Sequence, residues 1–265
     1  MITISVSPIA FTIFGISIRW YGVMVALGIL VLVLWVLWQA KRGANVSYDR
    51  VLTAALVGIP SGIVVSRLIH VADKWEYYIY NPGQIFGLSG LSGLTIWGAV
   101  LGAALGIWVY SKLSDFEFGY FADLTAPGII LAQAIGRVGC TINGCCYGNE
   151  TDLFCGIVYT DPESYAPLGV AVHPTQIYEI IYLLIMFVVL LSLRGRLRPD
   201  GSIFLVYLSL YSLWRIGLGF LREGTPFLFG LHQAQVIGIV VLAITIPIMA
   251  LRMRWLGAEW QSQEE

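Results

Sequence analysis

The chain has 265 residues, of which 58% are hydrophobic and 12% charged, and its formal net charge is −1. Its mean hydropathy of +0.79 is far above that of an average soluble domain, so a soluble globular protein is excluded. The basic residues are scattered, which gives no reason to expect a nucleic acid as a partner. We expect an all-α, polytopic integral membrane protein.

Seven apolar runs are long enough, at about 20 residues each, to cross about 30 Å of hydrocarbon. They cover residues 18–38, 51–72, 91–111, 124–138, 175–193, 202–221 and 233–251. The fourth run is short and contains glycines, so we expect its end to be broken or re-entrant. The first run has neither a cationic segment before it nor a cleavage site after it, which predicts a retained span. Without repeats or low-complexity segments, one membrane domain over residues 1–265 is the simplest expectation.

The basic residues of the short loops predict the orientation of the chain. With the N-terminus outside and the C-terminus cytoplasmic, nine of the fifteen basic residues face the cytoplasm. These nine are Lys41, Arg42, Arg50, Lys112, Arg194, Arg196, Arg198, Arg252 and Arg254. Residues 141–174 contain no Lys or Arg, and we expect them to form an outward-facing loop region. A short amphipathic segment at the interface is expected within residues 73–86.

This orientation brings arginines from several spans towards the outer leaflet. Arg67 lies near the end of the second run, Arg137 at the outer end of the fourth, and Arg215 well inside the sixth. Arg222 follows Arg215 by two helical turns, on nearly the same face. Because a charge in hydrocarbon is costly, the intramembrane arginines are expected to bind a ligand or a buried partner rather than to act as anchors.

Some of the neighbouring polar positions also have simpler explanations. Arg222 lies at the interface, where a side chain that reaches the head groups is equally well explained as an anchor. Tyr21, at the outer start of the first run, is by itself typical of an aromatic belt. His173, Gln176 and Glu179 stand at near-helical spacing and could form a buried hydrogen-bonded network at a helix start.

The segment GRVGCTINGCCYG, residues 136–148, combines Arg137 with four glycines. A guanidinium matches the oxygens of a phosphate and stays charged at any relevant pH. Glycines let backbone N–H groups approach the same anion. Arginines gathered at a membrane surface therefore predict a phospholipid as the ligand, and no cofactor is expected.

Four cysteines lie on or beside the predicted outer loop, at Cys140, Cys145, Cys146 and Cys155. On an extracytoplasmic face such cysteines favour disulfides or free buried thiols over metal ligands. Their spacing, C-x4-C-C-x8-C, is not a recognised zinc pattern. The sequence therefore predicts no metal site.

Four motifs together resemble the prolipoprotein diacylglyceryl transferase family. They are RWYG at 19–22, GRVGCTINGCCYG at 136–148, HPTQIYE at 173–179 and YSLWRIGLGFLRE at 211–223, in the family's order and approximate spacing. The resemblance implies seven spans in a bacterial inner (cytoplasmic) membrane, with the active site at the outer leaflet. It also implies transfer of the diacylglyceryl group of phosphatidylglycerol to the lipobox cysteine of a preprolipoprotein. A thioether forms and glycerol phosphate is released.

The resemblance also implies roles for individual residues. Arg137 resembles the family's essential phosphate-contacting arginine, and Arg215 resembles the essential arginine of the sixth span. Both would hold the phosphate and stabilise charge on the departing glycerol phosphate. Nearby cationic charge would also lower the pKa of the substrate thiol. The further positions expected to bind substrate or to assist are Tyr21, Arg67, Asn143, Gln176, Tyr211, Arg222 and Gln235.

The chain departs from the family pattern at several positions. The family often has a histidine early in the third span, a candidate for the general base, where GLTIWGAVLG at 93–102 offers Trp97. The indole of Trp97 cannot accept a proton. Cys140 and Cys145 stand where well-known members carry Asn and Glu, and Gly219 stands where a Glu is expected.

These departures leave the activation of the thiol open. The base is another group, with Tyr21 and His173 as candidates, or arginine charge alone activates the thiol. A changed reaction is the third explanation. We expect the transferase, and the alternative is a divergent homologue that binds phospholipid without transfer. A secondary transporter is disfavoured, because no internal repeat is visible.

Overall fold

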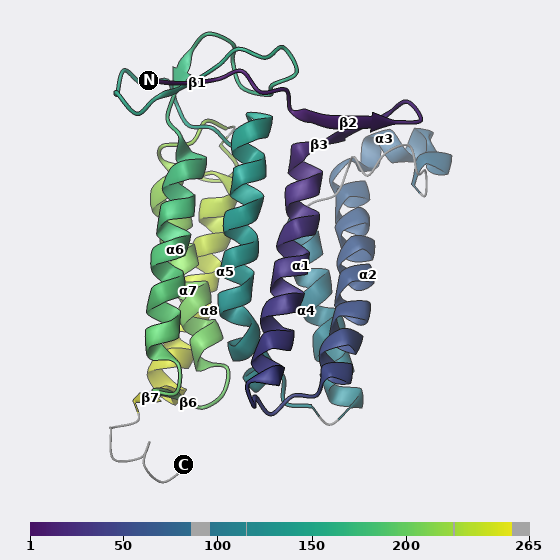
Figure 1. The fold of residues 1–265 in the computed structure, drawn as a ribbon, viewed down its shortest axis with the longest axis vertical. Helices are drawn as coiled ribbons and strands as arrows, with labels where there is room; N and C mark the ends of the chain where they lie inside the picture. Colours follow the sequence, from purple (N-terminus) through teal and green to yellow (C-terminus); the bar gives the residue numbers. More distant parts are fainter. Residues whose placement is uncertain (86–95, 115, 225, 256–265) are drawn as a thin grey trace. The chain divides into compact units, whose positions relative to one another are not determined.

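The computed structural model describes residues 1–85, 96–114, 116–224 and 226–255 of the chain (Figure 1). The chain divides into two compact units, each of which is described by itself. One unit comprises Met1–Trp35 and Gly119–Glu265, and the other comprises Val36–Phe118.

Within the described residues, six helices are long and apolar enough to cross a membrane. They are α1 (Trp20–Lys41), α2 (Tyr48–Asp73), α5 (Phe118–Asn143), α6 (Thr175–Leu193), α7 (Ser202–Gly219) and α8 (Gln233–Arg252). The third predicted run begins among residues outside the described part, and α4 (Ile96–Leu113) is the shorter apolar helix that follows. The all-α, polytopic membrane fold is confirmed.

The expected break in the fourth run is wrong, because α5 is one helix of 26 residues. Two of its glycines, Gly128 and Gly139, are contact points with α1 rather than breaks. A Cβ at Gly128 would lie 2.9 Å from the ring of Trp35, and one at Gly139 would lie 3.0 Å from the Cα of Tyr21. Small residues at such contacts let two membrane helices approach closely, which compensates for the low helix propensity of glycine.

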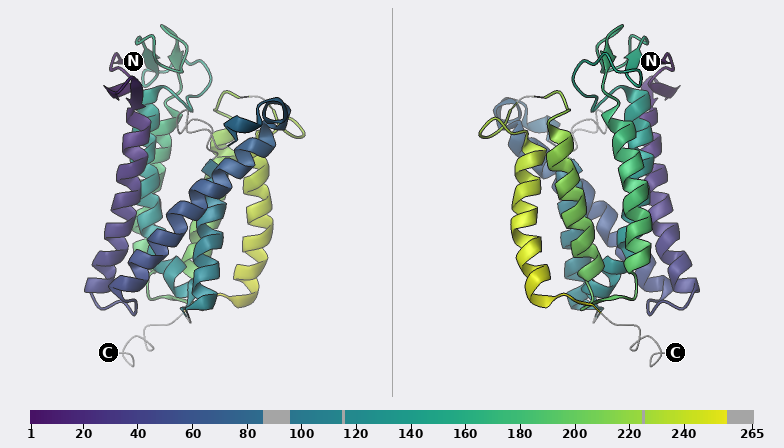
Figure 2. Two further views of the ribbon diagram at one scale, coloured as in Figure 1. Left: turned by 90° about the vertical axis from the view of Figure 1, so that its right-hand side faces the viewer. Right: turned by 90° about the vertical axis from the view of Figure 1, so that its left-hand side faces the viewer.

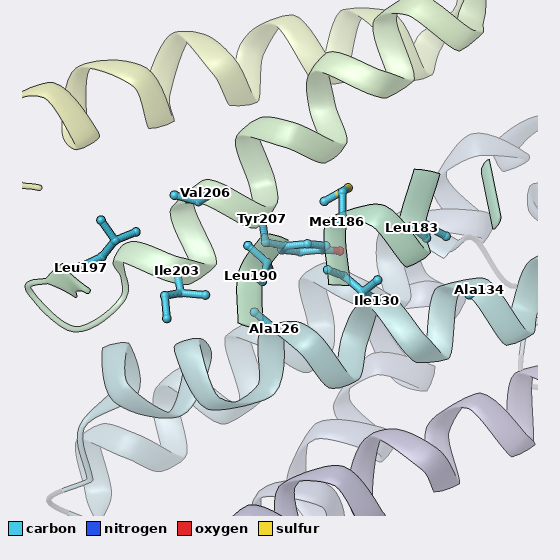
Figure 3. Close-up of a cluster of buried hydrophobic side chains, with 10 residues drawn as sticks. All are labelled: Ala126, Ile130, Ala134, Leu183, Met186, Leu190, Leu197, Ile203, Val206 and Tyr207. Atoms are coloured by element: carbon cyan, nitrogen blue, oxygen red, sulfur yellow. The ribbon is translucent and has the colours of Figure 1, made fainter. Parts of the chain in front are cut away.

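The core of the larger unit lies between α5, α6 and α7 (Figure 3). Its fully buried members include Ile130 of α5 and Leu183 and Leu190 of α6. The opposite face of α6 is exposed, with Ile185 at 56% and Val188 at 65% of their surface accessible. An apolar face of this kind is suited to contact with lipid tails.

A small sheet lies at the N-terminal end of this unit (Figure 2). Strand β1 (Ile2–Ile4) runs parallel to β4 (Ile157–Tyr159), which pairs antiparallel with β5 (Ala171–Val172). The hairpin of β2 (Ile9–Ile13) and β3 (Ile16–Arg19) leads into α1. The region 141–174 thus has strands and a core of its own, built from Ile157, Tyr159, Ala166 and Val172.

The other end of the unit carries β6 (Leu197–Arg198), paired with β7 (Arg254–Trp255), and a partly buried helix cap. The carboxylate of Asp123 in α5 accepts hydrogen bonds from the backbone N–H groups of Gly201 and Phe204, both at 2.8 Å. These groups belong to the start of α7, where unpaired N–H groups and the helix dipole favour an anion. Asp123 therefore fixes the start of α7 against α5.

In the smaller unit, α2 packs against α4 through glycines. A Cβ at Gly62 would lie 2.9 Å from the carbonyl oxygen of Ala99, so the two backbones are in contact. The predicted interfacial segment contains a short helix, α3 (Trp75–Tyr80), followed by a 3-10 turn, η1 (Pro82–Gln84).

Replacing the capping carboxylate tests the role of Asp123. We expect Asp123→Ala to lower the free energy of unfolding by about 1–2 kcal/mol, because two partly buried N–H groups at the start of α7 lose their acceptor. Thermal unfolding in detergent, followed by circular dichroism, measures the change. Asp200→Ala is the matched control, because Asp200 forms only a partly exposed pair with Arg198. Equal stability of the two variants would contradict this role.

Candidate functional site

A buried carboxylate joins two arginines from different helices. Oε2 of Glu179 in α6 lies 2.9 Å from Nε of Arg137 in α5 and 3.4 Å from Nη1 of Arg215 in α7. The hydroxyl of Tyr211, one turn before Arg215, donates to Oε1 of Glu179 at 3.0 Å. Only 2% of the Glu179 side chain is exposed. We call these four residues the arginine cluster.

The arginine cluster carries excess positive charge. One carboxylate faces two guanidinium groups, which leaves a net single positive charge at a site with little access to water. Nε of Arg215 is buried and has no hydrogen-bond partner among the described residues. A buried cation with an unused donor is costly unless an anion supplies the missing acceptor. The cluster is therefore suited to binding a singly charged anion.

The arginine cluster lies at the same end of the unit as the small sheet. Arg137 lies in the last two turns of α5, which ends at Asn143. Glu179 lies in the second turn of α6, and Arg215 lies about one turn before the end of α7 at Gly219. The regular helices hold these side chains at fixed positions, which suits precise binding of a planar or tetrahedral anion.

The segment that follows Arg137 is held against the start of α6. The hydroxyl of Thr175 donates to the carbonyl of Cys146 at 2.6 Å, and the amide of Gln176 donates to the carbonyl of Cys145 at 2.8 Å. Gly148 allows the close approach, because a Cβ there would overlap the carbonyl of Leu221 and lie 2.7 Å from Cβ of His173. Gln176 thus positions the cysteine segment.

The sulfur atoms of three of the four cysteines lie close together. The sulfurs of Cys140, Cys145 and Cys146 all lie within 4.8 Å of one another, and all four cysteines are free thiols in this structure. Nη1 of Arg137 lies 3.6 Å from the sulfur of Cys140. Hydrogen bonds from Cys140 and Cys145 lower the pKa of the Cys146 thiol against the effect of burial, with help from the charges of Arg222 and Arg137. These sulfurs form the cysteine cluster.

Tyr21 and His173, the two candidates for the base, lie in different surroundings. Tyr21, in the first turn of α1, is within electrostatic range of Arg137 and of the cysteine cluster. Nδ1 of His173 lies 3.4 Å from the hydroxyl of Tyr178, which is also 3.4 Å from the sulfur of Cys155. The observed ring contact of His173 is therefore with Tyr178, outside the arginine cluster.

Two residues expected to bind substrate have partners within the protein, and their contact with substrate stays a prediction. Oδ1 of Asn143 accepts a hydrogen bond from Nη1 of Arg19 at 3.1 Å, which ties the N-terminal hairpin to the end of α5. The amide of Gln235 donates to the carbonyl of Ile216 and accepts from the N–H of His232, at 3.0 and 2.8 Å. Gln235 therefore joins the start of α8 to α7.

For the remaining predicted residues, Arg222 and Arg67, the observed hydrogen bonds are with groups outside the arginine cluster. Arg222 follows α7, and its backbone pairs with Gly148, while its charge acts on Cys146. Arg67 belongs to the other unit, where its guanidinium donates to the carbonyls of Gln84 and Ile85, at 2.7 and 3.1 Å. The side chain of Trp97 lies outside the described residues. Convergence of Arg67 with Arg137 and Arg215 stays a prediction.

Sequence reasoning missed the central role of Glu179 and the meeting of the cysteines. The signal for Glu179 was available, because a carboxylate inside a predicted span needs a cationic partner. The cysteine cluster depends on a backbone detail: Cys146 has a φ of 66° and Gly144 a φ of 67°. L-residues rarely adopt this left-handed conformation, which here brings adjacent thiols to the same side.

Comparison with known proteins gives consistent results over almost the whole chain. Residues 8–251 match the family model described as prolipoprotein diacylglyceryl transferase. A phosphatidylglycerol–prolipoprotein diacylglyceryl transferase of Dehalococcoides mccartyi is 53% identical over 254 residues, which cover 96% of each chain. The enzyme of the same name from Clostridioides difficile is 38% identical over 232 residues, 88% of this chain and 90% of that one.

Removing the shared carboxylate tests the arginine cluster. We expect Glu179→Leu to lower the free energy of unfolding by about 3–5 kcal/mol, because two buried guanidinium groups lose their counterion. The matched control is Glu163→Leu, which removes an exposed carboxylate paired with Arg19 and is expected to cost less than about 1 kcal/mol. Thermal unfolding in detergent compares the two variants. A smaller loss for Glu179→Leu than for Glu163→Leu would contradict the buried pairing.

Proposed function

The chain belongs to the prolipoprotein diacylglyceryl transferase family, and from this premise we propose that the arginine cluster binds the phosphate of phosphatidylglycerol. The protein is a transferase that moves the diacylglyceryl group of this lipid to a prolipoprotein. The relatives are named for the transfer, and nothing in them favours a protein that only binds lipid. The acceptor is the thiol of the lipobox cysteine in the preprolipoprotein.

The charge balance is the observation that carries this proposal. A phosphodiester has one negative charge, and the arginine cluster has one positive charge in excess. The Nε–H of Arg215, which has no partner among the described residues, supplies a hydrogen bond for one of its oxygens. Arg222, whose charge reaches this end of α7, adds attraction for the head group.

The same arrangement favours the bond-breaking step. When the thiolate attacks the glycerol carbon that carries the phosphate, the carbon–oxygen bond breaks and glycerol phosphate leaves. The leaving group gains a second negative charge, so arginines fixed beside it bind the product side of the reaction more strongly than the substrate. Arg137 and Arg215 therefore act in catalysis as well as in binding, and Tyr211 orients Glu179 between them.

The positive charge of the nearby arginines favours activation of the acceptor thiol. The thiolate is the nucleophile, and nearby cations lower the pKa of a thiol. Arg137 lies beside the cysteine cluster, within electrostatic range of Tyr21. Of the two candidate bases, Tyr21 is the one favoured for contact with the acceptor thiol, because it lies near Arg137 and the cysteine cluster. His173 acts on the position of the loop through Tyr178.

The distribution of charge supports an active site that faces the outer leaflet of the bacterial inner membrane. Within the larger unit, the arginine cluster and residues 141–174 lie at one end. The loop and helix ends at Arg194, Arg196, Arg198, Arg252 and Arg254 lie at the other end, by β6 and β7. Cytoplasmic ends of spans are rich in Lys and Arg. The N-terminus and residues 141–174 are then outside, as parts of one membrane domain.

Transfer of a labelled diacylglyceryl group from phosphatidylglycerol to a lipobox peptide tests this function. We expect Arg137→Ala and Arg215→Ala each to reduce the rate at least about 100-fold, because fixed charge at the leaving phosphate is lost. Arg137→Lys keeps the charge without the two-pronged donor and should recover only part of the rate. The assay uses purified protein in detergent and quantifies thioether-linked product.

Arg198→Ala is the matched control, because Arg198 pairs with Asp200 at the opposite end of the unit. It should transfer at the wild-type rate. If Arg137→Ala and Arg215→Ala also transferred at that rate while folded, the phosphate-binding role would be wrong. A wild-type protein that binds the lipid but yields no thioether would instead favour the lipid-binding alternative.

A further inference from the structure

The cysteine cluster has no role in the proposed binding of the phosphate, although it adjoins Arg137. It contains three sulfurs that lie within 4.8 Å of one another. Zinc–sulfur bonds are about 2.3 Å long, so two sulfurs on a tetrahedral zinc ion are separated by about 3.8 Å. Each pair therefore has to close by about 1 Å at most to bind one ion. Thiolates are the ligands that soft metals such as zinc prefer.

The backbone around the cysteine cluster is arranged to hold these sulfurs together. Cys146 adopts the left-handed conformation, with a φ of 66°, although it is not a glycine. Such a conformation is costly and tends to mark functional sites. The carbonyls of Cys145 and Cys146 accept hydrogen bonds from Gln176 and Thr175 of α6. These hydrogen bonds fix the backbone of two of the three cysteines.

The composition of the cysteine cluster indicates which type of zinc site it would form. Among the described residues, the group contains three ligand atoms and no fourth His, Cys, Asp or Glu. Structural zinc sites are closed by four protein ligands, whereas catalytic sites have three and leave one position open. Zinc with three thiolates carries a net single negative charge, and the charge of Arg222, a residue outside the arginine cluster, acts on Cys146 and balances it.

We propose that Cys140, Cys145 and Cys146 bind one Zn²⁺ ion whose fourth position accepts the thiol of the incoming lipobox cysteine. The inference rests on the proposed transferase function. On binding to the ion the substrate thiol releases its proton to water, because a coordinated thiol is deprotonated. The thiolate then attacks the glycerol carbon, the carbon–oxygen bond breaks and glycerol phosphate leaves with its electron pair. The thioether product is a weaker ligand and dissociates.

The proposed zinc site is an alternative to a general base from a side chain. Coordination by a metal is one of the ways to activate a thiol nucleophile, so no side chain has to act as general base. Trp97, which replaces a candidate base of the family, is then compatible with full activity. Cys145 and Cys140, two positions at which the chain departs from well-known members, are both ligands of the proposed ion.

The metal content of the purified, full-length protein tests the site independently of activity. We expect one zinc ion per chain from zinc-supplemented cells, measured by inductively coupled plasma mass spectrometry. Cys145→Ser and Cys146→Ser should each lower zinc content at least tenfold. Cys155→Ser is the matched control and should keep the ion, because Cys155 contacts Tyr178 and is outside the cysteine cluster. Thermal unfolding checks that all variants fold.

Cobalt replaces zinc as a spectroscopic probe in the wild-type protein, which keeps the test valid if a variant fails to fold. Chelator-treated protein loaded with Co²⁺ should show thiolate-to-cobalt absorption. Adding a lipobox peptide should change that absorption, and the same peptide with Ser in place of Cys should leave it unchanged. Wild-type protein without zinc, or with a disulfide between two of the three cysteines, overturns the site. An identical response to both peptides overturns the open position.

The transfer assay separates this inference from the proposed function. Chelator-treated enzyme should lose at least 90% of its rate and regain it with Zn²⁺. Full transfer by metal-free enzyme would contradict the zinc inference and leave the transferase intact. Zinc bound as expected with no transfer under any condition would contradict the proposed function and leave the metal site intact.

Discussion

The buried carboxylate of Glu179 is the interaction on which the site depends. It lies between Arg137 and Arg215 and accepts a hydrogen bond from Tyr211, so it joins α5, α6 and α7 at one depth. Without it, two cations would face each other in a region with little water, at a cost of several kcal/mol. With it, one positive charge remains. The same interaction therefore stabilises the bundle and prepares the site for an anion.

The surrounding structure keeps this charge in place and positions the segment that follows Arg137. Asp123 fixes the start of α7, and the contacts of Gly128 and Gly139 hold α1 close to α5. The hydroxyl of Tyr159 in β4 donates to the carbonyl of Thr141, which ties the sheet of β1, β4 and β5 to the end of α5. The first turn of α6 holds the backbone of that segment through Thr175 and Gln176. In the proposed reaction, the lipid phosphate binds the arginine cluster and the acceptor thiol binds the adjoining cysteine cluster.

Much of the fold followed from the sequence, because the cost of exposing backbone to lipid makes apolar runs reliable signals of helices. Arg137 and Arg215 were identified because a charge inside a membrane span is costly and is therefore expected to bind a ligand or a buried partner. The continuity of α5 was mispredicted because Gly128 and Gly139 act through contacts with α1, which a local pattern does not contain. The cysteine cluster was missed because it depends on the backbone conformation of Cys146.

Selective binding of the charged lipid tests the central claim most directly. The affinity of the purified protein for phosphatidylglycerol and for uncharged diacylglycerol can be compared by native mass spectrometry, for wild type and for Arg215→Met. If one net positive charge binds the phosphate, the wild type should prefer phosphatidylglycerol at least about tenfold, which corresponds to about 1.4 kcal/mol. Arg215→Met should lose that preference. Equal affinity of the wild type for both lipids would contradict the account.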